Sequence, residues 1–158
     1  MKNTGTLKVT LRGDREVVLE RVFDAPRALV FEAMTKPELV KKWYGPHGHN
    51  LVVCEIDFRV GGKWRYVLRG PDGTDMGQFG EFREIVPPER IVMTEGFDMF
   101  PDSVAVDTVV LVEEAGKTRM TLTVVAPSKE ARDGIIASGM EHGAAETYDR
   151  LNEVLTSR

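Results

Sequence analysis

Several features that define common protein classes are missing from this 158-residue chain. Its single cysteine, Cys54, allows no intrachain disulfide and no metal site built from several cysteines. No apolar run approaches the roughly 20 residues that a transmembrane helix needs. The first 11 residues are polar and alternating, without the apolar core of a signal peptide. We therefore expect a cytoplasmic protein with no membrane insertion.

Basic segments and catalytic motifs are missing too. No run of Lys and Arg is interleaved with aromatic residues, and the net charge is −4, which argues against nucleic acid as a partner. The chain has no Gly-x-Ser-x-Gly, no phosphate-binding glycine loop and no spaced nucleophile and base. Its three histidines and scattered carboxylates show no metal-ligand spacing. The sequence predicts neither a metal nor a cofactor.

What is present is typical of a globular domain. The chain is 42% hydrophobic and 29% charged, and its length suffices for a real core. No repeat, linker or low-complexity segment divides it. We expect one domain over residues 1–158, with a core from about residue 17 to residue 155.

The C-terminal segment from Ser128 to Leu155 is predicted to be one long amphipathic helix. At 1.5 Å per residue it would run for about 40 Å, and Ser128 can cap its first free amides. Three glycines, Gly134, Gly139 and Gly143, each cost about 1 kcal/mol against alanine in a helix interior. They favour close packing or a bend, or they leave room beside the helix for a ligand. Apolar residues recur at steps of three and four on one face: Ile136, Met140, Ala144, Tyr148, Leu151 and Leu155.

The rest of the chain predicts a strand-rich middle. Two short helices, Arg27–Met34 and Thr35–Trp43, follow the first strands, with Asp24 as the cap of the first helix. Consecutive strands with short turns form an antiparallel meander, and a long twisted sheet must curl. We therefore predict an α+β fold in which a curved antiparallel sheet wraps around the long C-terminal helix, with a cavity between them that suits a small ligand. The predicted strands are Thr6–Leu11, Glu16–Phe23, Val52–Phe58, Lys63–Leu68, Met76–Ile85, Arg90–Phe97, Val104–Glu113 and Thr118–Ala126.

Aromatic and methionine side chains are the predicted lining of this cavity. Trp64 and Tyr66 are two residues apart on one strand and therefore share a face. Each of these residues is also compatible with ordinary core packing, although seven methionines and twelve aromatics together favour an adaptable apolar interior. The predicted ligand-binding residues are Trp43, Trp64, Tyr66, Phe97, Met120, Met140 and Tyr148.

Three titratable residues are candidates for acid–base chemistry. His47 lies in a glycine-rich loop near Trp43, and histidine titrates close to neutral pH. Glu95 shares parity with Phe97 on its strand, so it faces the same side. Asp57 also falls on a predicted strand, where its side chain points either to solvent or into the cavity. An inward carboxyl would have a raised pKa and could act as a base. An exposed position is the alternative for all three.

Several separated segments resemble one protein superfamily. They are Trp43–Pro46 (WYGP), Asp57–Tyr66 (DFRVGGKWRY) and Gly80–Ile91 (GEFREIVPPERI). In this order they are similar to the START-like (SRPBCC) superfamily, in the branch named for homology to the activator of the heat-shock protein 90 ATPase. The resemblance implies a helix-grip fold. That fold hosts lipid carriers, hormone receptors and cyclases, so fold alone does not fix a function.

The leading functional hypothesis is the binding of a small hydrophobic or amphipathic molecule between the sheet and the C-terminal helix. One alternative is an enzyme of the cyclase, dehydratase or hydrolase type that uses the same pocket, which requires a buried acid or base. The other is a protein-interaction module resembling a co-chaperone, which predicts an exposed apolar patch on the sheet. The sequence leaves a homodimer open.

Overall fold

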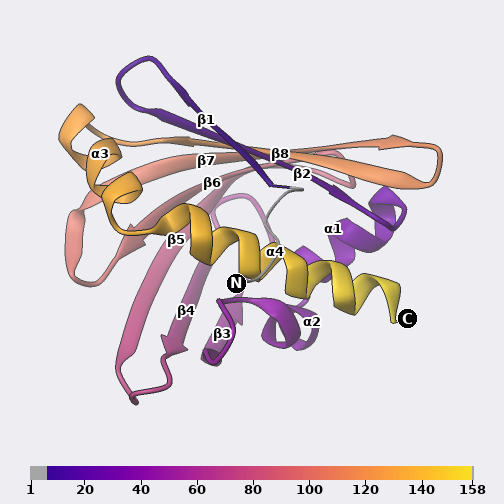
Figure 1. The fold of residues 1–158 in the computed structure, drawn as a ribbon, viewed down its shortest axis with the longest axis horizontal. Helices are drawn as coiled ribbons and strands as arrows, with labels where there is room; N and C mark the ends of the chain where they lie inside the picture. The colour runs from indigo at the N-terminus through magenta and orange to yellow at the C-terminus, as the bar shows by residue number, and fades with distance from the viewer. Residues whose placement is uncertain (1–6, 158) are drawn as a thin grey trace.

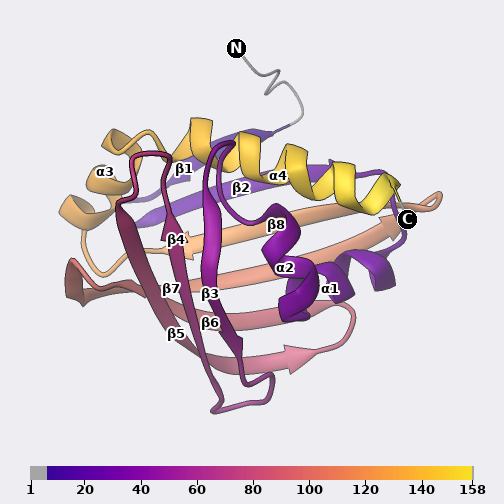
Figure 2. The same cartoon turned by 90° about the horizontal axis from the view of Figure 1, so that it is seen from below.

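The computed structural model describes residues 7–157, and they form a curved antiparallel sheet wrapped around a helix (Figures 1 and 2). The strand order across the sheet is β1-β2-β8-β7-β6-β5-β4-β3. The predicted α+β helix-grip arrangement is confirmed. The strands are β1 (Lys8–Arg12), β2 (Glu16–Phe23), β3 (Asn50–Ile56), β4 (Lys63–Arg69), β5 (Asp75–Val86), β6 (Arg90–Phe97), β7 (Phe100–Glu114) and β8 (Lys117–Val125). The helices are α1 (Arg27–Thr35), α2 (Pro37–Trp43), α3 (Lys129–Ala137) and α4 (Met140–Thr156).

Local chemistry explains where the sheet turns and bends. The β7–β8 hairpin turns at Ala115 and Gly116, which both have positive φ, as a tight hairpin turn requires. In β5 the pairing with β6 shifts register between Phe82 and Glu84, and such bulges increase the bend of a strand. A side chain at Gly80 would overlap the carbonyl oxygen of Thr94 and the indole of Trp64, so only glycine allows this close approach.

Asp24 does not cap α1, in contrast to the sequence prediction. The residue at the cap position is Pro26, and no side chain caps this helix. The Asp24 carboxylate instead accepts a hydrogen bond from Asn152 Nδ2 at 3.2 Å, and Lys117 Nζ lies 3.4 Å away. Asp24 therefore links the end of β2 to the C-terminal part of α4.

The predicted single C-terminal helix is in fact two helices. Gly139 has φ +83°, in the left-handed region, and the chain bends there between α3 and α4. The predicted cap at the start of α3 is confirmed, since Ser128 Oγ accepts a hydrogen bond from the Ala131 amide at 3.1 Å. The other two glycines differ from each other: a Cβ at Gly134 would meet open space, whereas one at Gly143 would lie 3.5 Å from Pro46.

The densest packing lies between the sheet and the C-terminal half of α4. Four of the largest fully buried side chains meet there: Phe23 of β2, Leu111 of β7, Met120 of β8 and Leu151 of α4. We call this region the closed end. None of the helices within residues 7–157 combines the length and apolar character needed to cross a membrane.

Candidate functional site

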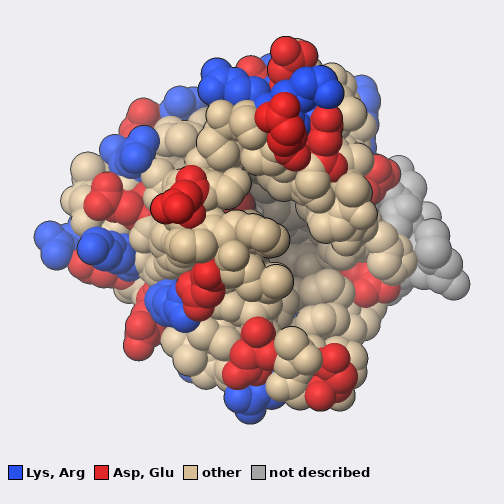
Figure 3. All heavy atoms as spheres, turned by 90° about the vertical axis from the view of Figure 1, so that its left-hand side faces the viewer, with Lys and Arg blue, Asp and Glu red and all other residues tan. Residues whose placement is uncertain are grey.

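Burial along the elements shows that the interior opens toward the N-terminal half of α4. On β8, Met120 is fully buried, whereas Leu122 and Val124 on the same face are only half-buried. On α4, Leu151 is fully buried and Tyr148 is half-buried. Figure 3 shows a deep hollow in the molecular face at this end, on the left-hand side of Figure 1 where α3 lies. We call this region the open end, and the space between the sheet and α4 there the cleft.

Two carboxyl groups share the inner face of the sheet at the open end. Glu95 of β6 pairs with Ala105 of β7, and Asp107 pairs with Met93, so the two acids are diagonal neighbours on one face. Asp107 is only 4% exposed. Burial and the adjacent Glu95 raise the pKa of Asp107 well above its usual range. The two carboxyl groups lie close enough to interact directly, and this contact contributes to the raised pKa of Asp107. We call Glu95 and Asp107 the carboxyl pair.

One oxygen of this pair is left without a donor. Among residues 7–157, no hydrogen-bond donor reaches Asp107 Oδ1, although the atom is fully enclosed. A buried polar atom without a partner costs about 1–3 kcal/mol, so native proteins rarely keep one without a reason.

Three tyrosines surround the carboxyl pair. The Tyr44 hydroxyl donates to Gln78 Oε1 at 2.6 Å, and its ring centroid lies 4.9 Å from that of Tyr66. Within the described part of the chain, the hydroxyls of Tyr66 and Tyr148 have no hydrogen-bond partner. Burial is the main cause that raises the pKa of both phenols, and the nearby Glu95 contributes to both, after Cys54 in the case of Tyr66. These hydroxyls therefore stay neutral and can donate a hydrogen bond.

A buried cation near the site is already engaged. Arg21 of β2 is 6% exposed, and its Nη1 lies 2.7 Å from Asp149 Oδ1 of α4. Neither it nor any other cation contributes to the pKa of Asp107. Among residues 7–157, buried side-chain oxygens without a partner are Asp107 Oδ1 and Asp149 Oδ2, and of these Asp107 Oδ1 lies with the carboxyl pair.

The structure distributes the predicted ligand-binding residues over two environments. Tyr66, Phe97, Met140 and Tyr148 are half-buried, and Phe97 pairs with the inward-facing Gln78. The other three, Trp43, Trp64 and Met120, are buried in the core.

The two buried tryptophans are held by backbone carbonyl groups. The Trp43 indole donates to Ala33 O at 3.0 Å, and the Trp64 indole donates to Thr94 O at 3.2 Å. Both tryptophans are therefore part of the packed core and not of an open binding surface.

Of the three predicted titratable candidates, the structure brings only Glu95 to the cleft. His47 is exposed, and its backbone amide donates to Glu146 Oε1 at 3.1 Å. Asp57 is also exposed and pairs with Arg59 at 2.9 Å. The sequence argument missed Asp107, although a lone acid among the apolar residues of the VAVDTVVLV segment was a usable signal.

The described residues offer no obvious metal or thiol chemistry. Within residues 7–157, no three His, Cys, Asp or Glu side chains gather closely enough to hold a metal ion. Cys54 is buried, and burial raises its pKa to about 11. A thiol with this pKa is almost entirely protonated at neutral pH and reacts slowly.

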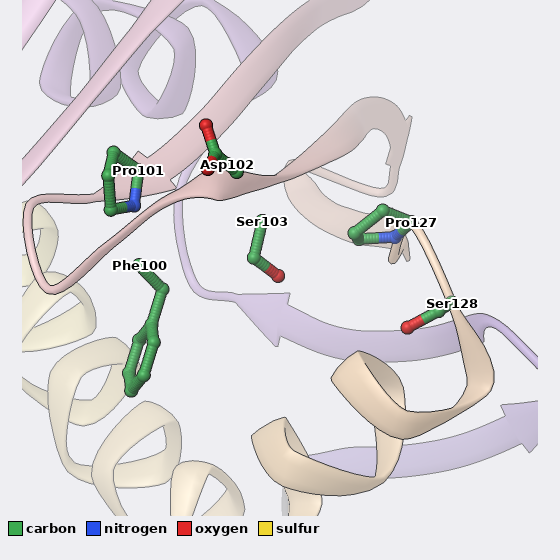
Figure 4. A pocket seen from close by; sticks show the side chains of 6 residues that line it. All are labelled: Phe100, Pro101, Asp102, Ser103, Pro127 and Ser128. Carbon is green, nitrogen blue, oxygen red and sulfur yellow. The ribbon is translucent and has the colours of Figure 1, made fainter.

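A depression of about 460 Å³ lies beside the open end, where β7 begins and the chain passes from β8 to α3. In Figure 4 the hydroxyls of Ser103 and Ser128 face this space, while the Phe100 ring and the Asp102 carboxylate point to opposite sides of the strand. Phe100 is 63% exposed and the adjacent Met99 is 74% exposed. The margin of the open end therefore carries exposed apolar side chains.

Comparison with known proteins shows structures of the same fold and the family to which the chain belongs. A crystal structure of a Rhodobacter sphaeroides protein is 26% identical, with a TM-score of 0.91, and the match covers 97% of this chain and 99% of that one. A solution structure of an Arthrobacter aurescens protein is also 26% identical, with a TM-score of 0.86 and coverage of 97% and 93%. A comparison with curated proteins gave no match. Residues 24–156 match the family model described as "Activator of Hsp90 ATPase homolog 1-like protein", and the chain belongs to that family.

Proposed function

We propose that the protein binds a small amphipathic molecule in the cleft between the sheet and the N-terminal half of α4. The observation that carries this proposal is the contrast between the two ends of one interior. At the closed end Met120 and Leu151 are completely buried, whereas at the open end Leu122 and Tyr148 on the same faces are only half-buried, although Ala145 beside them is buried. Figure 3 shows a hollow at that end. A concave, mostly apolar site with a few polar groups is typical of small-molecule binding.

The lining suits a ligand with an apolar body. Met140 and Tyr148 of α4 and the half-buried Leu122 and Val124 of β8 pack against one apolar cluster. The carboxyl pair and Tyr66 lie on β6, β7 and β4, so a bound molecule would place its polar end against the sheet, where the Tyr148 hydroxyl of α4 can also reach it.

The test is direct binding of N-phenyl-1-naphthylamine, a neutral fluorescent probe, together with native mass spectrometry of the purified protein. At a free concentration of 100 times Kd, a ligand stabilises the folded state by about 2.7 kcal/mol. For a chain of this size that corresponds to roughly 5–11 °C in Tm.

Met140→Trp tests the location of the site, because the larger side chain would fill the cleft at the start of α4. We expect at least a tenfold weaker Kd in this variant. Val60→Trp, at an exposed position in the β3–β4 turn, is the control and should bind like the wild type. A wild-type protein that binds no probe and carries no co-purified molecule, or three proteins with equal affinity, would contradict the proposal.

The carboxyl pair favours an enzyme of the cyclase, dehydratase or hydrolase type as a second candidate. A buried carboxyl with a raised pKa can keep its proton near neutral pH and act as a general acid, and the neighbouring carboxylate can act as a base. An enzyme of this kind would lose turnover in Asp107→Asn while still binding its substrate. A carrier would show no turnover with either protein.

A further inference from the structure

The carboxyl pair is the feature of the cleft that ordinary packing does not explain. Burying an acid in an apolar interior costs free energy unless its oxygens accept hydrogen bonds. A buried polar group with only part of its hydrogen bonds is less favourable there than an apolar residue. Yet Asp107 stands between buried neighbours of its own strand, Ala105 and Val109, with one oxygen that no donor reaches within residues 7–157.

The surroundings of the pair are one-sided in charge. The influences that act on Asp107 are its burial and the carboxyl of Glu95. The buried cations within the described residues are Arg21 and Arg132. Arg21 is held by Asp149, and Arg132 Nη1 donates to the carbonyl groups of Gly13 and Glu16 at 3.1 and 3.3 Å. The pair therefore combines two acidic side chains with no cation beside them and presents an oxygen, Asp107 Oδ1, that no donor of the described residues reaches.

We propose that the carboxyl pair is an acceptor site which selects ligands whose polar end donates hydrogen bonds, a hydroxyl or an amine, and rejects ligands that end in a carboxylate. This inference rests on the proposed function, since it names the class of molecule that the cleft takes. A donor would complete Asp107 Oδ1, whereas an anion would meet a like charge in a poorly hydrated space.

The two free phenols are compatible with this selection. The hydroxyls of Tyr66 and Tyr148 can each rotate to accept from a ligand hydroxyl or to donate to its oxygen. Both tyrosines lie near Glu95, which contributes to the raised pKa of each phenol.

The experiment compares three probes that share a naphthalene body: 2-naphthylmethylamine, 2-naphthol and 2-naphthoate, titrated at pH 7 by calorimetry. The ammonium and the carboxylate are both strongly hydrated ions, so a preference between them reports the sign of charge in the site rather than polarity. We expect the wild-type protein to bind the amine and the naphthol at least tenfold more tightly than the carboxylate.

Asp107→Leu assigns this preference to the carboxyl pair and should reduce the tenfold difference to less than threefold. Asp57→Leu removes an exposed acid of the same type and should keep the difference intact. Glu95→Gln supplies a second test within the pair and is expected to narrow the preference as well, because it weakens amine binding and removes a like charge that opposes naphthoate.

The outcomes separate this inference from the proposed function. Equal binding of all three probes by the wild type would overturn the selection and leave the ligand-binding proposal standing. A preference that survives in both Asp107→Leu and Glu95→Gln would also overturn it. Failure of all three probes to bind a folded wild-type protein would overturn both.

Discussion

Replacement of Asp107 by leucine is expected to make the protein more stable. Asp107 is only 4% exposed, and a leucine side chain has nearly the same shape as that of aspartate. The substitution removes a buried oxygen that has no donor within residues 7–157. Because an unpartnered buried polar group costs about 1–3 kcal/mol, we expect the free energy of unfolding to rise by about that amount at pH 8.

The increase in the free energy of unfolding of Asp107→Leu should depend on pH in a defined direction. The pKa of Asp107 is higher in the folded protein than in the unfolded chain, mainly because of burial. As pH rises above the unfolded value of about 3.9, the unfolded chain releases its proton first, so wild-type stability falls until the folded pKa is passed. The advantage of Asp107→Leu is therefore smallest near pH 4 and grows as pH rises.

The other groups that face Asp107 do not reverse this sign. Glu95 is present in both proteins, and Tyr44, Tyr66 and Tyr148 have pKa values raised above the ordinary phenol range, so they stay neutral across the window. The charges of the nearby Arg21–Asp149 pair are also common to both proteins.

Asp149→Leu is the matched control, with the same chemical change and the opposite expected result. Asp149 is the partner of the buried Arg21 at 2.7 Å, and its loss leaves a buried guanidinium unpaired. Breaking a buried ion pair in this way typically costs 3–5 kcal/mol. The two substitutions therefore differ in sign although both remove a buried aspartate.

Urea denaturation followed by tryptophan fluorescence at pH 5 and pH 8 measures all three proteins. A wild-type protein that is more stable than Asp107→Leu at pH 8 would refute the reasoning, because the carboxyl would then have a favourable partner. An Asp107→Leu gain that is identical at the two pH values would refute the pKa argument alone.

Three further predictions follow from the packing. Gly134→Ala in α3 should raise the free energy of unfolding by up to about 1 kcal/mol, because its Cβ meets open space and alanine is the better helix former. Gly80→Ala should lower it by more than 2 kcal/mol, because its Cβ would overlap Thr94 and Trp64; denaturant midpoints measure both variants. Cys54 should react with 5,5′-dithiobis(2-nitrobenzoate) at pH 7.5 far more slowly in the folded protein than in urea, since the thiol is buried and its pKa is about 11, and a rate equal to that of the unfolded chain would contradict its burial.

The order of elements was predictable because local signals agree with the tertiary fold. Strand alternation, turn residues and the apolar stripe of α4 all appear within short windows of sequence. The break at Gly139 was less visible. A glycine within a helical pattern of apolar residues is equally compatible with close packing, with a bend or with free space beside the helix. The three glycines of this segment differ in that respect.

The site was harder to predict because it depends on burial across different elements. Glu95 could be placed by parity with Phe97, but its partner Asp107 lies on another strand, and their diagonal relation follows from the β6–β7 register. His47 has the right chemistry for a catalyst, but its side chain is exposed. The sequence shows which residues can titrate, whereas the exposure of their side chains depends on the packing of segments that are far apart in the chain.

The outer face of the sheet bears on the remaining alternative, a protein-interaction module. That hypothesis predicts an exposed apolar patch on the sheet, yet the outer side chains of β4, β5 and β6 include ion pairs that bridge separate segments. Arg65 lies 2.6 Å from Asp98, Arg69 lies 2.7 Å from Asp75, and Arg90 lies 2.8 Å from Glu84.

Ion pairs of this kind add little stability, but they hydrate the surface and oppose docking through apolar contact. The inner face shows the reverse, an apolar surface that encloses unpartnered polar groups. A sheet that is charged outside and carries an unsatisfied acid inside is better suited to hold a small molecule than to dock a protein, and the closed end supplies the packing that keeps such an acid in place.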